Sequence, residues 1–214
     1  MARVELIWTI VVGGGSGRRF GTPKQYEPLG ESRVIDVSRA VAEQVSDGVV
    51  VVVPEQDAVR ENAVAGGATR SESVRAGLAA VPENASIICI HDAARPLATE
   101  SLYKNVIQAV AEGVDAAVPG LGVTDTIKVV EDGVVTNTLD RETLVAVQTP
   151  QAFRAHVLRE AHAGGGTSTD DSALVEALGG KVVVVPGEER NRKITLPDDL
   201  AWARREIVSE GELT

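Results

Sequence analysis

The stretch VVGGGSGRRFGTPKQ, from Val11 to Gln25, decides how this chain is organised. An apolar run ends in three glycines, and Arg18, Arg19 and Lys24 follow within the same stretch. Glycine allows backbone conformations and close approaches that let N–H groups face an anion, and the basic side chains add positive charge. We therefore expect a strand that delivers a phosphate-binding loop at its carboxyl end.

This loop differs from the two familiar phosphate-binding motifs. Phe20 stands where the dinucleotide motif has its third glycine, and no Gly-Lys-Ser/Thr sequence follows. The cations indicate triphosphate chemistry instead, because arginine and lysine offset the charge that develops on phosphate oxygens during attack at phosphorus. Taken alone, the loop is equally compatible with a glycine-rich strand-to-helix turn whose basic side chains are solvated.

The composition is that of a folded α/β chain in which any anion must be bound locally. The chain has 214 residues, of which 31 are acidic and 21 basic, and its formal net charge is -10. This charge argues against broad nucleic-acid or anionic-membrane binding, so an anionic ligand needs a local basic pocket. Aromatic residues make up only 3%, and a core of Val, Ile, Leu and Ala is typical of buried parallel strands. One domain over residues 1–214 is expected.

Nothing in the sequence predicts a membrane segment or an oxidising compartment. Cys89 is the single cysteine and lies in an apolar run, so we expect a buried thiol with no intrachain disulfide. The apolar run from Leu6 to Val12 leads directly into the glycines and is interpreted as a first strand, not as a signal peptide. No segment has transmembrane length, and a cytoplasmic protein is expected.

Hydrophobic periodicity predicts strands that alternate with helices along most of the chain. After the first strand, the predicted strands are Val49–Val53, Ser86–Ile90, Ala116–Pro119 and Lys181–Val185. The first predicted helix carries the repeat Val34, Val37, Val41 and Val45, with Ser32 as its cap, and the second covers Glu55–Ala65. A third helix has an apolar face of Val74, Leu78 and Val81, and Thr99 caps a fourth. Three more helices are predicted to follow Arg154, to begin near Asp170 and to begin at Pro197. Strand, helix and strand in this order indicate a right-handed parallel unit.

A second polar cluster, HDAARP, follows the apolar strand SIICI. Ligands bind at the carboxyl ends of strands in an open parallel sheet, so Asp92 and Arg95 are expected to share a crevice with the glycine loop. A carboxylate among phosphates is a ligand that Mg²⁺ accepts, and Asp92 is predicted to hold metal or substrate, although an isolated strand-end aspartate often only caps a turn. His91 is interpreted as a packed strand residue. His156 and His162 are placed on a surface helix without ligand spacing, so no metal is assigned to the histidines.

Residues 122–147 predict a β-hairpin arm. The strands Ile127–Val130 and Val134–Leu139 flank a turn that contains Asp132 and Gly133. An isolated two-stranded hairpin is only marginally stable in water, so the arm should pack against something, most simply a second copy of the chain. A homodimer through the arm is therefore expected.

A series of motifs, in order from about residue 6 to residue 205, resembles the 2-C-methyl-D-erythritol 4-phosphate cytidylyltransferase family. The motifs are GGGSGRR, PKQ, GGATRSESV, HDAARP, DTIK, DR, TPQAF, TDDSALVE and NRKIT followed by PDDL. HDAARP and TPQ-F are the more specific ones, whereas the glycine loop is shared with many sugar-nucleotide transferases. The resemblance implies a Rossmann-like nucleotidyltransferase fold with a mostly parallel central sheet and a protruding β-hairpin arm.

The same resemblance implies a reaction, a cofactor and a set of residues. The reaction is a Mg²⁺-dependent transfer of CMP from CTP to 2-C-methyl-D-erythritol 4-phosphate, which gives CDP-methylerythritol and pyrophosphate in non-mevalonate isoprenoid biosynthesis. By this likeness the catalytic residues are Arg19, Lys24, Asp92 and Lys193, with Asp92 also helping to hold the metal. The implied CTP-binding residues are Gly13, Gly14, Gly15, Gly17, Arg18, Gly67, Arg70, Ser73 and Ala93. The implied substrate-binding residues are Arg95, Thr126, Arg141 and Thr149, and Thr126 and Arg141 would reach the substrate of the partner subunit.

The sequence departs from this family at a few positions. Gly13 and Gly14 stand where relatives commonly have alanine, and Ala68 offers no polar side-chain group beside Gly67.

Two alternative functions stay open. A ribitol-5-phosphate cytidylyltransferase would share the fold and most motifs, although the two alanines before the arginine of HDAARP favour methylerythritol phosphate. A non-catalytic nucleotide-binding regulatory module would need affinity but not a full set of charges around a reacting phosphorus.

Overall fold

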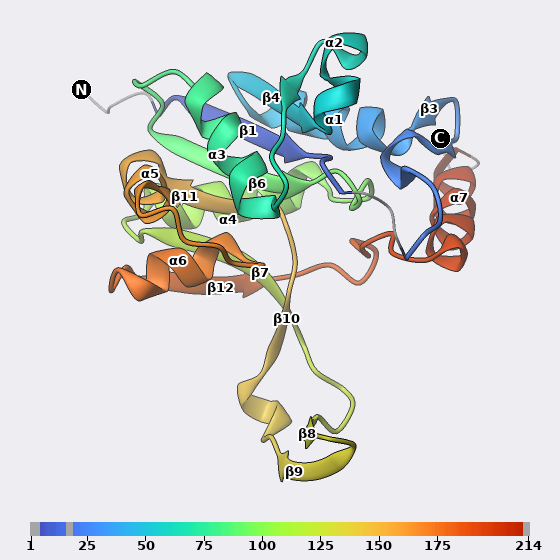
Figure 1. Ribbon diagram of the computed structural model, residues 1–214, viewed down its shortest axis with the longest axis vertical. Coiled ribbons are helices and arrows are strands. Elements are labelled where there is room, and N and C mark those ends of the chain that lie inside the picture. The colour runs from blue at the N-terminus through green and yellow to red at the C-terminus, as the bar shows by residue number, and fades with distance from the viewer. Residues whose placement is uncertain (1–4, 16–18, 212–214) are drawn as a thin grey trace.

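The structure is a computed structural model that describes residues 5–15 and 19–211. Within these residues an eight-stranded sheet forms the centre, in the order β10-β7-β11-β6-β1-β4-β5 with β12 also paired to β7 (Figure 1). Its strands are β1 (Ile7–Val12), β4 (Gly48–Val53), β5 (Val64–Ala65), β6 (Ile87–Asp92), β7 (Ala116–Gly122), β10 (Val145–Val147), β11 (Gln151–Arg154) and β12 (Val182–Pro186).

The sheet is mostly parallel, as predicted. β1 lies between β4 and β6 and is parallel to both, and β12 is parallel to β7. β11 runs antiparallel between β6 and β7, and β10 runs antiparallel to β7. Ile10 and Val11 are adjacent in β1 and are both 0% exposed. Because adjacent strand residues point to opposite faces, the sheet must be covered on both sides.

Helices supply that cover. They are α1 (Val34–Val45), α2 (Ala58–Glu61), α3 (Arg70–Ala80), α4 (Glu100–Ala111), α5 (Ala155–Ala163), α6 (Asp171–Ala177) and α7 (Pro197–Gly211). One core cluster joins the apolar faces of α3, α5 and α6 to the sheet, and a second joins those of α1 and α4 to its other face. Thr99 caps α4 as predicted, since its hydroxyl oxygen accepts from the Leu102 N–H at 3.1 Å.

A smaller core holds the C-terminal helix beside the sheet. Leu29, Ile194 and Leu200 are buried together there, and α7 packs against β2 (Pro28–Leu29), which pairs with the short β3 (Ser32–Arg33). Ile194 N–H also donates to the Ala94 carbonyl at 2.7 Å. This packing brings the loop after β12 to the carboxyl end of β6.

The predicted helix Glu55–Ala65 is wrong. The structure has a 3-10 turn at Glu55–Asp57, the single helical turn of α2, and then β5. Asn62 adopts a left-handed conformation with φ 48 and ends α2. The chain then pairs with the edge of β4, so tertiary strand pairing replaces the longer helix.

Two further details differ from the sequence expectations. Ser32 lies in β3, and Arg33 precedes α1 with its side chain paired to Asp36 at 2.7 Å. The motif TPQAF, for which no helix or strand was predicted, contributes Gln151, Ala152 and Phe153 to β11. The antiparallel insertion of β11 between β6 and β7 places Thr149 behind the end of β6.

The predicted arm is present and stands away from the sheet (Figure 1). Its tip is the antiparallel pair β8 (Lys128–Glu131) and β9 (Val134–Thr138), and a 3-10 turn at Arg141–Thr143 precedes β10. Asp132 and Gly133 form the turn with φ values of 49 and 80. Positive φ at both positions is what a tight hairpin turn requires. Of the helices described, none is long and apolar enough to cross a membrane.

Candidate active site

A cavity of about 430 Å³ opens at the carboxyl ends of β1 and β6. Val12 and Asp92 end these strands and lie opposite each other in the parallel register. The glycine loop and HDAARP therefore meet in one crevice, as the strand-end rule predicts. The cavity is lined by Val12, Gly13, Gly14, Gly15, Arg19, Phe20, Lys24, Gln25, Gly67, Ala68, Thr69, Arg70, Ser73, Asp92, Ala93, Ala94, Lys193 and Thr195.

The glycine loop lies tightly against the two neighbouring helices. Gly13 N–H donates to the Val52 carbonyl at 2.7 Å, and a Cβ at Gly13 would lie 2.9 Å from Ile35 Cδ1. A Cβ at Gly14 would lie 3.1 Å from Ser73 Oγ. The small residues thus let the loop approach α1 and α3 closely. Gly17 and Arg18, two of the predicted CTP-binding residues, lie outside the described residues.

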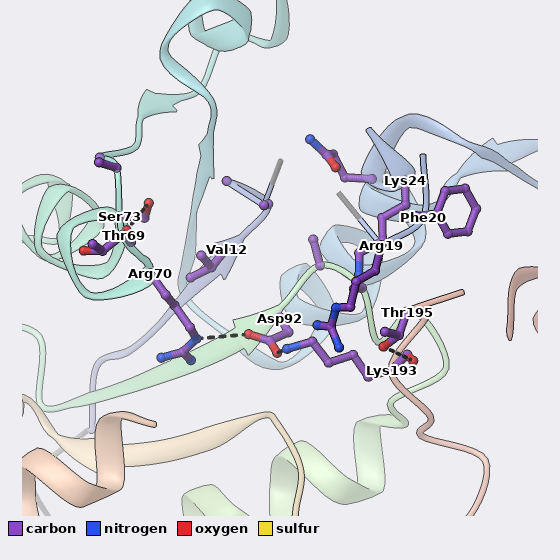
Figure 2. Close-up of a pocket in the computed structure, with 18 residues that line it drawn as sticks. Val12, Arg19, Phe20, Lys24, Thr69, Arg70, Ser73, Asp92, Lys193 and Thr195 are labelled. Carbon is purple, nitrogen blue, oxygen red and sulfur yellow. Dashed lines mark hydrogen bonds and ion pairs between the residues drawn. The ribbon is translucent and has the colours of Figure 1, made fainter. Parts of the chain in front are cut away.

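Asp92 is held between two cations (Figure 2). Lys193 Nζ lies 2.5 Å from Asp92 Oδ2, and Arg70 Nε lies 3.4 Å from Oδ1 on the other side. Burial alone raises the pKa of the Asp92 carboxyl, but Lys193 and Arg70 outweigh burial and hold that pKa well below its usual range. Asp92 is therefore a carboxylate at any physiological pH.

Lys24 belongs to the same group of charges. Its Nζ donates to the Ile194 carbonyl at 2.5 Å, next to Lys193 in the chain. Burial lowers the pKa of Lys24, and the nearby Lys193 and Arg19 lower that pKa further. Four basic side chains line this cavity together with the Asp92 carboxylate: Arg19, Lys24, Arg70 and Lys193. An anionic ligand would relieve their mutual repulsion.

The start of α3 forms the wall of the cavity beside the glycine loop. Thr69 caps this helix, since its hydroxyl oxygen accepts from Glu72 N while Glu72 Oε2 accepts from Thr69 N at 2.8 Å. A Cβ at Gly67 would lie 2.3 Å from Glu72 Cβ, so this turn requires glycine. Gly67, Arg70 and Ser73 are brought to the cavity together, as the resemblance implied.

Sequence reasoning missed what lies behind Arg70. Arg70 Nη1 donates to Asp171 Oδ2 at 2.6 Å, and Asp171 Oδ1 lies 3.1 Å from His162 Nε2. Asp171 is 1% and His162 3% exposed, so the surface position predicted for His162 is wrong. The hydrophobic pattern of the sequence does not indicate this burial. It arises because α5 places His162 on its apolar side, toward Asp171 at the start of α6.

Four predicted substrate residues do not line the cavity. Arg95 donates from Nη1 to the Asn191 carbonyl at 2.8 Å, and Thr149 Oγ1 accepts from Asp92 N at 3.0 Å. Arg95 was expected to share the crevice with the glycine loop, but it is not a lining residue, and the ion-pair partners of Asp92 are Lys193 and Arg70. Thr126 and Arg141 are exposed on the arm, where Arg141 Nη1 donates to the Thr124 carbonyl at 2.7 Å. Gln25, Phe20, Thr69 and Thr195 line the cavity without having been predicted.

The donor set is compatible with a metal that arrives with phosphates. No group of three or more His, Cys, Asp or Glu side chains is placed to hold a metal among the residues described. Asp92 is the one carboxylate among the described lining residues. Mg²⁺ is commonly bound through one or two carboxylates together with substrate phosphates and water, so this single carboxylate fits such a role.

Comparison with known proteins identifies the family. The sequence model of the family "IspD: 2-C-methyl-D-erythritol 4-phosphate cytidylyltransferase" matches residues 7–209. The chain belongs to this family. The enzyme of that name from Carboxydothermus hydrogenoformans is 40% identical over 220 residues, which cover 94% of this chain and 94% of the relative. The bifunctional enzyme IspD/IspF of Anaeromyxobacter dehalogenans is 44% identical over 225 residues, and the matched region spans 95% of this chain but only 58% of that relative.

Solved structures of the IspD family have the same fold. The 2-C-methyl-D-erythritol 4-phosphate cytidylyltransferase of Thermus thermophilus has a TM-score of 0.79 at 33% identity, covering 93% of this chain and 98% of that one. The 4-diphosphocytidyl-2C-methyl-D-erythritol synthase of Anaerococcus prevotii has a TM-score of 0.83 at 27% identity, covering 95% and 99%. The predicted Rossmann-like nucleotidyltransferase fold is thereby confirmed.

Proposed function

We propose that this chain transfers CMP from CTP to 2-C-methyl-D-erythritol 4-phosphate and releases pyrophosphate. The proposal rests on one arrangement in a member of the IspD family: Asp92 lies between Arg70 and Lys193, beside the glycine loop and Lys24. This arrangement concentrates positive charge around a cavity that is open to a triphosphate. It belongs to a chain whose formal net charge is -10, so the basic character is local.

The reaction needs charge stabilisation more than proton transfer. A phosphate oxygen of the substrate attacks the α-phosphorus of CTP, the bond from that phosphorus to the bridging oxygen breaks, and its electron pair leaves with pyrophosphate. The attacking phosphate monoester is already an anion, so no strong general base is required. Arg19, Lys24 and Lys193 would offset the charge on the equatorial and leaving oxygens.

The remaining cavity residues would bind the nucleotide. The backbone of Gly13, Gly14 and Gly15 faces the triphosphate in this proposal, and Gly67, Arg70, Ser73 and Ala93 surround the rest of the nucleotide. Gly17 and Arg18 are proposed to extend the triphosphate loop. When Mg²⁺ is bound, it neutralises part of the phosphate charge, and Asp92 is the residue that would hold it.

We further propose that the chain works as a homodimer. Val130 and Val134 on the arm are 54% and 65% exposed, and such β-branched side chains on a two-stranded hairpin favour a covering partner. Thr126 and Arg141 would then contact the substrate of the other subunit, and Arg95 and Thr149 would support the substrate from within the same chain.

We also propose a cytoplasmic location. The single cysteine, Cys89, is a buried free thiol, which is compatible with that location.

Substrate choice is tested directly. The purified chain is incubated with CTP and Mg²⁺, together with either 2-C-methyl-D-erythritol 4-phosphate or ribitol 5-phosphate, and pyrophosphate release is measured. Release with the methylerythritol substrate is expected. Release with ribitol 5-phosphate alone would replace the proposed substrate, and CTP binding without release in either reaction would favour the non-catalytic module.

A further inference from the structure

Two buried side-chain amides, Gln148 and Asn191, join the base of the arm to the loop that carries Lys193. Gln148 follows β10, where the chain returns from the arm, and Asn191 stands two residues before Lys193. Gln148 is 5% and Asn191 0% exposed. Figure 1 shows the segment between β12 and α7 passing the base of the arm, and hydrogen bonds from Gln148 place it there. We call these two side chains the amide clasp.

The amide clasp supplies hydrogen bonds to a segment, residues 187–196, that lies in no helix or strand. Gln148 Nε2 donates to the Glu188 carbonyl at 2.8 Å, and Gln148 Oε1 accepts from Glu188 N at 3.0 Å. One side-chain amide thus binds both backbone groups of one residue. Asn191 Nδ2 donates to the Thr149 carbonyl at 2.8 Å. Residues 187–196 belong to no helix or strand, so these side chains fix a segment that lacks a ladder of its own.

Thr149 connects the clasp to Asp92. Its carbonyl accepts from Asn191, while its hydroxyl oxygen accepts from the backbone N–H of Asp92 at 3.0 Å. Arg95 adds a third contact, since its Nη1 donates to the Asn191 carbonyl at 2.8 Å. The Asn191 side chain, two residues before Lys193, is therefore hydrogen-bonded to Thr149, the same buried residue whose hydroxyl group supports the end of β6.

Lys193 stands between this attachment at Asn191 and Ile194, whose backbone N–H donates to the Ala94 carbonyl at 2.7 Å. The Lys193 side chain is 40% exposed and reaches Asp92 through a long flexible stem, so the ion pair alone does not determine where its backbone lies. Neither Gln148 nor Asn191 lines the cavity. A contribution of the clasp to the reaction must therefore pass through a neighbour that does line it, either Lys193 or, by way of Thr149, Asp92.

We propose that the amide clasp positions Lys193. It sets the register of the Lys193 loop against the base of the arm, so that the ammonium group meets Asp92 and the reacting phosphates. Supporting contacts of this kind hold a reactive group near its productive geometry, and a displacement of about 1 Å can cost roughly 10²-fold in rate. The role in turnover rests on the function proposed above, whereas the effect on Lys193 itself does not.

A double-mutant cycle tests the effect on turnover. Asn191→Ala is expected to lower kcat about tenfold in the wild-type background and less than twofold in a Lys193→Ala background, because the clasp has nothing left to position there. Asn105→Ala, at an exposed position of α4, is the matched control and should leave kcat unchanged in both backgrounds. Equal losses from Asn191→Ala in the two backgrounds would overturn the proposal.

Chemical labelling tests the effect on Lys193 without turnover. Acetic anhydride is applied in trace amounts, and the acetylation rate of each lysine is followed by peptide mass spectrometry. In Asn191→Ala the rate at Lys193 is expected to rise at least threefold, while the rates at the exposed Lys104 and Lys128 stay constant. This result would support the clasp even if the wild-type chain failed to turn over CTP. An unchanged rate at Lys193 would overturn the proposal.

A second variant removes the other half of the clasp. Gln148→Ala should reproduce both results, with Gln108→Ala at an exposed position of α4 as its control. Circular dichroism and thermal unfolding check that each variant folds. Loss of the fold in both Asn191→Ala and Gln148→Ala would count against a positioning role and would assign the amides to stability alone.

Discussion

Lys193 Nζ lies 2.5 Å from Asp92 Oδ2 although 101 residues separate the two in the chain. Asp92 ends the central strand β6, whereas Lys193 comes from an irregular loop that α7 and the smaller core hold in place. The position of Asp92 is thus fixed by the sheet, whereas that of Lys193 is fixed by the packing of the smaller core beside the sheet. The contact between them joins the part of the cavity formed by β6 and the glycine loop to the C-terminal part of the chain.

Removal of the charge on Asp92 should disable the site. Asp92→Asn keeps the size of the side chain but leaves Lys193 and Arg70 without their shared counter-charge. We expect kcat/KM for CTP to fall about 10²-fold, a loss typical when one preorganised electrostatic contact is removed. Pyrophosphate release measures it, with Asp198→Asn at an exposed position of α7 as the control. A value within threefold of wild type would mean that Asp92 has no part in the reaction.

Lys24 should matter more for turnover than for binding. Burial and the neighbouring Lys193 and Arg19 lower the pKa of Lys24, so its charge is unfavourable in the empty site and is best offset as phosphate charge develops. We expect Lys24→Ala to lower kcat about 10²-fold while the Kd for CTP, measured by calorimetry, changes less than tenfold. Lys104→Ala, at a side chain 64% exposed, serves as the control. Unchanged pyrophosphate release would remove Lys24 from the catalytic set.

The sequence predicted the parts of the site that local rules govern. Apolar runs gave the central strands, and the position of ligands at strand ends brought Asp92 to the glycine loop, as the register of Val12 with Asp92 shows. The cap at Thr99 followed from residue type alone.

Contacts made only by tertiary packing were not predictable in the same way. Arg70 and Asp171 are 101 residues apart, and no periodicity relates the start of α3 to the start of α6. TPQAF has too few residues to show a strand pattern, and β11 forms because β6 and β7 each offer it a partner. The segment Glu55–Ala65 has helical composition, but its last two residues pair with β4 and form the strand β5.

The exposed valines of the arm should decide the oligomeric state. Val130→Asp with Val134→Asp places charges on side chains that are 54% and 65% exposed in the single chain. If the arm packs against a second copy, these charges are buried at the interface, and the dimer should dissociate at least tenfold more readily. Light scattering after size-exclusion chromatography measures the mass across a range of concentrations.

Val59→Asp is the matched control for the arm, since Val59 is 96% exposed on α2, away from the arm. It should leave the mass unchanged. A wild-type chain that is monomeric at all concentrations, or an arm variant with an unaltered dimer, would contradict the proposed interface.

His91 should make the protein sensitive to mild acid. His91 is 0% exposed, with Nε2 3.1 Å from the Arg95 carbonyl and Nδ1 3.2 Å from Thr149 Oγ1. The carbonyl accepts the Nε2 proton, so Nδ1 is left as an acceptor for the Thr149 hydroxyl and the ring is neutral. Burial lowers the pKa of His91 to about 4.

The sign of the pH effect follows from this lowered pKa. Between the unfolded-state pKa of about 6.5 and the folded-state value of about 4, the unfolded chain binds a proton that the folded chain does not, so stability falls as the pH falls. From pH 7 to pH 5 the contribution of His91 amounts to about 2 kcal/mol of lost unfolding free energy. Urea unfolding at the two pH values should show wild type losing about 2 kcal/mol more than His91→Gln, whereas His156→Gln, at an exposed position, should lose as much as wild type. Equal losses in wild type and His91→Gln would show that His91 takes up its proton as readily in the folded chain as in the unfolded one.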